Sequence, residues 1–153
     1  MKKKDIEWIR ASSSMPIVSN VVEIDGRGYL DGGISDSIPL KFFEDKGYDK
    51  NIVITTQPYD YVKPEVKKKK AMKIALKKTP AIYDAMMKRH LMYNEEVRYI
   101  KEKEKEGDVL VIRPKDTLPI NRISHDPDEM TLVYNIGRDI AEENIEKIKE
   151  YLG

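Results

Sequence analysis

Hydrophobic and polar positions alternate along the chain with two different periods, which predicts a mixture of strands and helices. Contiguous apolar runs at Asn51–Thr56 and Val109–Ile112 are typical of strands. The first run is expected to be buried on both faces, as in a parallel sheet covered by helices. Apolar residues at helical spacing predict helices over residues 2–11, 39–46, 64–78 and 80–106, and from about residue 128 onward.

Turn residues separate these segments and refine their bounds. Ile17–Ile24 is expected to be a strand with Val22 and Ile24 on one face, followed by a tight turn at residues 25–28 and a second strand at residues 29–30. Gly47 and Gly107 are expected just past the ends of two helices, and Pro80 in the first turn of another. The last helix carries a predicted apolar stripe of Met130, Val133, Tyr134, Gly137, Ala141, Ile145, Ile148 and Leu152.

The order of these elements predicts an α/β fold with right-handed crossovers. The length of 153 residues predicts one domain. The chain has no cysteine, so disulfides and thiolate zinc sites are excluded. Lysines 2–4 are not followed by the apolar segment of a signal peptide, and we expect a cytoplasmic protein that associates with membranes at most peripherally.

Asp31-Gly32-Gly33 is the segment with the most chemical information. A carboxylate directly after a strand can be presented at the rim of a sheet, where ligands of α/β proteins bind. The two glycines would let the backbone turn sharply and let another group approach closely. The simpler interpretation is an ordinary turn, because Asp-Gly is a common turn pair.

Several segments in fixed order resemble bacterial members of the patatin-like phospholipase family. They are residues 11–18, Asp25-Gly26, Tyr29–Gly33, residues 37–40, residues 51–58, Arg89-His90 with Tyr93-Asn94, residues 111–114 and residues 134–137. The resemblance covers only the C-terminal half of that family. It implies a three-layer α/β/α patatin-like fold, incomplete because the N-terminal half is missing, with residues 1–153 as the C-terminal part of one domain.

The resemblance also implies a lipid acyl hydrolase that cleaves carboxylic esters with a Ser-Asp dyad and needs no cofactor. Asp31 matches the catalytic aspartate of the family, and Gly32 and Gly33 match the positions that follow it. The family's nucleophilic serine lies in a G-x-S-x-G motif, and this chain contains none. We therefore expect the isolated chain to be inactive. We also expect it to form a homo-oligomer or to pair with the missing N-terminal half.

The histidines give little sign of other chemistry. A Ser-His-Asp triad is not expected, because His90 and His125 are the only histidines and no serine lies in a nucleophile elbow. No metal site is expected, since two separated histidines form no ligand cluster.

A basic segment, Lys63–Lys78, contains eight lysines and one glutamate, a local net charge of +7. It fits a solvated helix face, a surface that docks on anionic lipid, or a nucleic-acid site. We expect no nucleic-acid partner, because the segment lacks interleaved aromatic residues. The alternative function for the chain is thus a non-catalytic, membrane-associating module that uses this segment.

Overall fold

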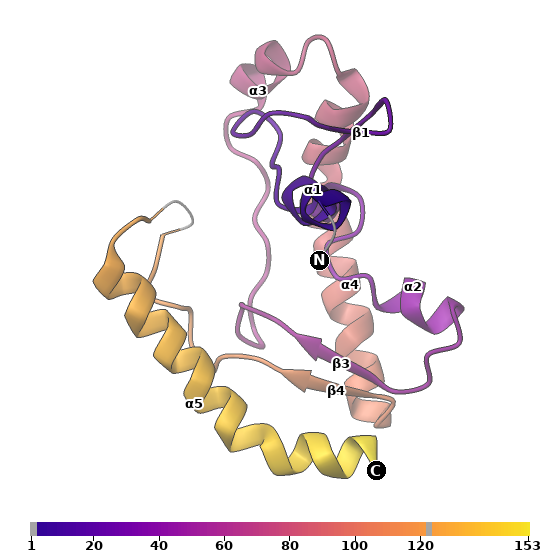
Figure 1. Ribbon diagram of the computed structural model, residues 1–153, viewed down its shortest axis with the longest axis vertical. Coiled ribbons are helices and arrows are strands. Elements are labelled where there is room, and N and C mark those ends of the chain that lie inside the picture. Colours follow the sequence, from indigo (N-terminus) through magenta and orange to yellow (C-terminus); the bar gives the residue numbers. More distant parts are fainter. Residues whose placement is uncertain (1–2, 122–123) are drawn as a thin grey trace. The chain divides into compact units, whose positions relative to one another are not determined.

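The computed structural model describes residues 3–121 and 124–153, with side chains from residue 5 onward (Figure 1). The chain divides into two compact units. The first unit is Met1–Pro39 with Lys63–Val97, and the second is Leu40–Val62 with Arg98–Gly153. Helices combine with small sheets in the described residues, which confirms the α/β class. The expected single domain over residues 1–153 and its three-layer arrangement stay predictions.

Helix α1 and a β-hairpin form the core of the first unit. Helix α1 (Lys3–Ser12) packs against β1 (Val22–Ile24), which pairs antiparallel with β2 (Arg27–Tyr29). Ala11, Val22 and Ile24 are the buried residues of this cluster, so Val22 and Ile24 share one face as predicted. The Trp8 and Tyr29 rings meet edge to face, with centroids 4.7 Å apart. The expected helix began at Lys2, which lies outside the described residues.

The hairpin is shorter than predicted because its first strand begins late. Ile17 has a φ of 72° and lies in a turn, where it is exposed, so the strand expected over Ile17–Ile24 is confirmed only at its end. Asp25 and Gly26 both have positive φ, as a two-residue hairpin turn of type I′ requires. Residues 27 and 28, expected in the turn, belong to β2.

The basic helix is also shorter than predicted. Helix α3 runs only from Lys69 to Ala75, whereas a helix over residues 64–78 was expected. Upstream, the Asn94 side chain accepts a hydrogen bond from the Lys63 N–H at 2.8 Å and donates one to the Lys63 carbonyl at 3.1 Å. The amide thus satisfies both backbone groups of Lys63, as a neighbouring strand would, and holds the chain just before the expected start of the helix.

Helix α4 (Pro80–Glu106) has the predicted bounds, and its residues up to Val97 belong to the first unit. Gly107 follows it with a φ of 84°, the conformation expected of a glycine past a helix end. Helix α2 (Leu40–Asp45) of the second unit is followed in the same way by Gly47, with a φ of 83°. Tyr48 then donates a backbone hydrogen bond to the Phe43 carbonyl, which completes a Schellman motif.

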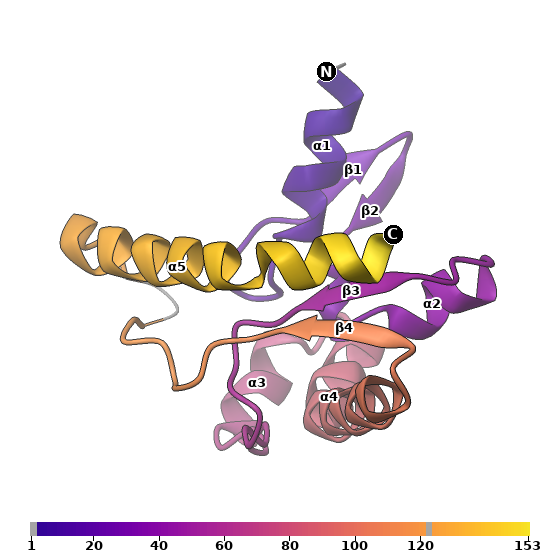
Figure 2. The ribbon, with the colours of Figure 1, turned by 90° about the horizontal axis from the view of Figure 1, so that it is seen from below.

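Two parallel strands organise the second unit. Strand β3 (Asn51–Ile54) pairs in register with β4 (Val109–Ile112). Helix α5 (Pro127–Leu152) lies on one side of this pair, and the last turns of α4 lie on the other (Figure 2). The Tyr151 hydroxyl accepts from the Asn51 N–H at 3.1 Å and donates to the Asp108 carbonyl at 2.6 Å. The end of α5 therefore ties the beginnings of both strands together.

Two expectations about burial in the second unit are wrong. Ile54 is 75% exposed, so β3 is not buried on both faces. Most of the stripe predicted on α5 is also exposed, including Tyr134 at 64%. The partly buried face instead includes Ile136 and Ile140. At 100° per residue this face lies about a quarter turn from the predicted stripe, so α5 leaves much apolar surface uncovered.

Candidate functional site

Asp31 lies after β2, and its carboxylate caps a short 3₁₀ turn, η1 (Gly32–Ile34). Its Oδ1 accepts a hydrogen bond from the Gly33 N–H at 2.8 Å. The Asp31 N–H donates to the Ser14 carbonyl at 2.8 Å, and Ser14 is only 5% exposed. Within the described ranges Oδ2 accepts no hydrogen bond. One carboxylate oxygen is thus fixed and the other remains available as an acceptor.

The Gly33 carbonyl is held from two directions. The Ser37 hydroxyl and the Arg89 Nε each donate a hydrogen bond to it at 2.7 Å. A Cβ atom at Gly33 would lie 3.1 Å from the Asp31 Oδ1 and 3.3 Å from the Arg89 Nη2. Gly33 therefore allows a carboxylate and a guanidinium to approach the backbone closely, as the sequence predicted.

Gly32 has no such role in the structure. A Cβ atom at Gly32 would meet nothing within 4 Å. The backbone turns here, but neither Gly32 nor Gly33 has a positive φ, so the turn does not depend on the conformational freedom of glycine and fits the simpler interpretation of an ordinary turn. The turn is formed by the 3₁₀ geometry and the Asp31 cap, which any L-residue could adopt.

Glu96 holds the segment that follows η1. Its two carboxylate oxygens accept hydrogen bonds from the Ser37 and Ile38 N–H groups, each at 3.1 Å. Burial raises the pKa of Glu96 above 4.5, and the neighbouring Asp36 carboxylate also raises it, while the two N–H groups act in the opposite direction. Two residues of α4, Arg89 and Glu96, therefore hold the backbone immediately after Asp31.

Sequence reasoning missed Glu96 and noticed Arg89 only as part of a resembling segment. A signal for both residues exists in the helical spacing. Arg89, Tyr93 and Glu96 are separated by four and three residues and so share one face of α4. Tyr93 is 9% exposed, which identifies this as the packed face. Charged residues that flank a buried aromatic on a packed face need partners, and here the partners are backbone groups.

Neither histidine lies in a catalytic arrangement. His90 has a buried Nδ1 with no hydrogen-bond partner, and His125 is exposed in the loop before α5. No hydrogen bond of the described residues joins either imidazole to a serine hydroxyl. No group of three or more potential metal ligands occurs in the ranges 3–121 and 124–153.

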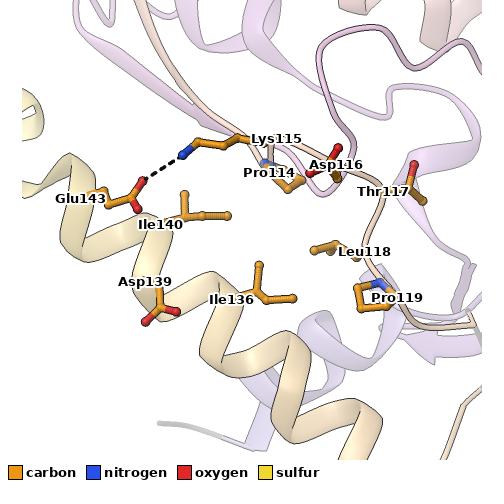
Figure 3. Close-up of a pocket in the computed structure, with 10 residues that line it drawn as sticks. All are labelled: Pro114, Lys115, Asp116, Thr117, Leu118, Pro119, Ile136, Asp139, Ile140 and Glu143. Carbon is orange, nitrogen blue, oxygen red and sulfur yellow. Dashed lines mark ion pairs between the residues drawn. The ribbon is translucent and has the colours of Figure 1, made fainter.

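A small cavity of about 290 Å³ lies between α5 and the loop after β4 (Figure 3). Leu118 and Ile136 face each other across it, and Ile140 and Pro114 add to its apolar wall. The rim is polar and includes an ion pair between Lys115 and Glu143 at 3.8 Å. The wall carries no histidine and no serine, so it offers no Ser-His pair for acyl transfer.

Two family models match separate parts of the chain. Residues 5–43 match the patatin-like phospholipase family, and this range contains Asp31, Gly32 and Gly33. Residues 79–153 match a domain of unknown function, DUF6363. The resemblance to patatin-like phospholipases is thus confirmed over residues 5–43, and the similarity indicates a family of lipid hydrolases.

A curated relative gives the scale of the comparison. The chain is 43% identical over 58 residues to the uncharacterized protein YjjU of Escherichia coli strain K12. This alignment covers 37% of the present chain and 16% of YjjU. The chain therefore spans a minor part of that relative. Among the helices that the structure describes, none has both the length and the apolar character needed to cross a bilayer.

Proposed function

We propose that this chain supplies the catalytic carboxylate of a lipid acyl hydrolase and that Asp31 is the proton acceptor. The observation that carries the proposal is the position of Asp31 in the segment that matches patatin-like phospholipases. Its geometry supports the role, because Oδ1 is fixed by the Gly33 N–H and Oδ2 accepts no hydrogen bond from the described residues. A general base needs such an oriented oxygen that still has a free lone pair.

The proposed chemistry is a two-step ester hydrolysis. The serine hydroxyl proton moves to the Asp31 Oδ2 while the serine oxygen bonds to the ester carbonyl carbon. The carbon–oxygen bond to the alcohol then breaks, and the alcohol leaves with that proton. Water next loses a proton to Asp31 and attacks the acyl-enzyme, which releases the fatty acid and restores the serine. No cofactor takes part.

The nucleophile in this proposal belongs to another segment or polypeptide. The present sequence has no G-x-S-x-G motif, and it spans only 16% of the relative YjjU. The proposed architecture is a three-layer patatin-like domain with residues 1–153 as its C-terminal part, completed by a segment that carries the serine and the oxyanion donors. The parallel β3–β4 pair supports this architecture, because it has an exposed apolar residue, Ile54, that additional strands and helices could cover.

The test joins this chain to a patatin-like segment that carries G-x-S-x-G and measures hydrolysis of a short acyl ester. The isolated chain should show no hydrolysis above background. In the joined protein, Asp31→Asn should lower kcat by about 10²–10⁴-fold, since the amide fills the same space but cannot accept the proton. His90→Ala and His125→Ala serve as controls and should keep most of the activity.

Each alternative outcome has a definite meaning in this assay. Turnover near the parental rate in Asp31→Asn would show that the assignment of Asp31 is wrong. Loss of activity in a histidine variant, with the fold retained by circular dichroism, would show that the dyad is wrong. A folded joined protein without activity would favour a non-catalytic module.

A further inference from the structure

Helix α3 and its flanks form a dense basic surface. Residues 67–78 contain seven lysines and no acidic residue. All seven are exposed. Of these seven, only Lys69 forms an ion pair in the described part of the chain, with Glu65. We call residues 67–78 the lysine segment.

The lysine segment has one packed side and one open side. Leu76 is 7% exposed and Met72 is partly buried, so these two residues mark the packed side of the segment. Ile74 lies on the opposite side and is 77% exposed, more than any other large hydrophobic residue of the described ranges. Lys70 lies one helical turn before Ile74 on α3, and Lys77 and Lys78 follow in the turn after the helix ends at Ala75. This exposed aliphatic side chain therefore belongs to a segment whose lysines, apart from Lys69, form no ion pair in the described residues.

An ordinary solvated surface does not require this arrangement. Soluble proteins usually mix both signs of charge, as the end of α4 does over residues 101–106. Neighbouring lysines on a short helix repel one another and destabilise it. The helix also has no side-chain cap at its N-terminus to offset that cost.

We propose that the open side of the lysine segment docks on the surface of an anionic bilayer, with Ile74 entering the interface. Lysines near a negative lipid surface are attracted to it, and a nearby aliphatic residue adds apolar burial. The segment contains no aromatic residue on which a base could stack, which disfavours single-stranded nucleic acid. The lipid hydrolase similarity of residues 5–43 is a second reason to choose lipid.

The test uses the chain itself and does not depend on catalysis. Binding is measured by co-sedimentation with vesicles of phosphatidylcholine alone and of phosphatidylcholine mixed with phosphatidylglycerol. The test variant replaces Lys70, Lys73 and Lys77 with Gln. The matched control replaces three exposed lysines elsewhere, Lys88, Lys105 and Lys147, with Gln, so the net charge changes equally. Circular dichroism checks the fold of both variants.

The parent and the control should bind the anionic vesicles, and added salt should weaken that binding. The test variant should bind at least roughly tenfold more weakly, because each lysine near an anionic surface contributes separately. Ile74→Ser should also weaken binding without changing the salt dependence. Equal binding to both vesicle types, absence of binding, or equal losses in the test and control variants would overturn the proposal. Tighter binding to a nucleic-acid oligomer than to anionic vesicles at the same salt would overturn it as well.

Discussion

Removal of the Glu96 carboxylate is expected to loosen the backbone that follows the proposed catalytic aspartate. In the folded chain this carboxylate accepts the Ser37 and Ile38 N–H groups, both at 3.1 Å. Glu96→Ala leaves both donors without their protein acceptor. Glu96 lies on α4, and alanine is a good helix former, so the substitution should not weaken the helix itself. The expected loss of stability therefore comes from the two N–H groups that no longer have a protein acceptor.

The size of the effect follows from the two hydrogen bonds and their surroundings. A hydrogen bond to a charged acceptor contributes about 1.5–3 kcal/mol, and less where water can replace the acceptor. Glu96 is only partly buried, so we expect a total loss of about 2 kcal/mol for the pair. For a chain of this length, that loss corresponds to a Tm decrease of roughly 4–8 °C.

The matched control removes a glutamate that binds no backbone group. Glu142 pairs with Arg138 on α5, and both side chains are 59% exposed. Glu142→Ala should cost about 0.3–0.5 kcal/mol, as surface helix pairs do. Urea unfolding gives the free energies of unfolding, and amide hydrogen exchange reports on the Ser37 and Ile38 N–H groups. Equal destabilisation of the two variants, or unchanged exchange at both amides in Glu96→Ala, would refute the reasoning.

Three further predictions concern pH, packing and association. The pKa of Glu96 is raised in the folded chain, so the folded chain binds the Glu96 proton more tightly than the unfolded chain does. The stability gained from this proton is present below pH 4.5 and is lost as pH rises through the folded pKa. In urea unfolding, the stability advantage of the parent over Glu96→Gln should therefore shrink above pH 4.5, and a widening advantage would contradict this. Gly33→Ala should destabilise by about 1–3 kcal/mol in the same assay and Gly32→Ala hardly at all, because only Gly33 has close neighbours. The isolated chain should form oligomers or aggregate through exposed apolar residues such as Ile54 and Tyr134, and a monodisperse monomer in light scattering at high concentration would contradict this.

The elements that the sequence predicted well are those with complete local signals. Helix α4 begins at a proline and is followed by a glycine, and its predicted bounds of 80–106 agree with the structure. Strand β4 is a short apolar run with the predicted bounds of Val109–Ile112. In both cases neighbouring residues alone specify where the element begins and ends, so no distant contact is needed.

The errors arose where a contact with a distant side chain decides the local structure, or where too few elements pack over an apolar surface to bury it. Asn94 holds the Lys63 backbone, and no pattern within residues 63–78 reveals that contact. Periodicity correctly placed an apolar stripe on α5, but it does not tell which side of a helix a small sheet can cover. Two strands cover little surface, so Ile54 and Tyr134 remain exposed although their spacing is typical of buried positions.

The contacts of α4 connect the two family-matched segments of the chain. Asp31 and Gly33 lie in the patatin-like range 5–43, whereas Arg89 and Glu96 lie in the range 79–153 that matches DUF6363. Arg89 donates to the Gly33 carbonyl, and Glu96 accepts the two N–H groups that follow four and five residues later. Without these bonds the Ser37 and Ile38 N–H groups would need new acceptors, and the Gly33 carbonyl would keep only the Ser37 hydroxyl. The orientation of the Asp31 carboxylate is therefore supported by a helix that lies outside the patatin-like match, and a function assigned to Asp31 has to include residues of both segments.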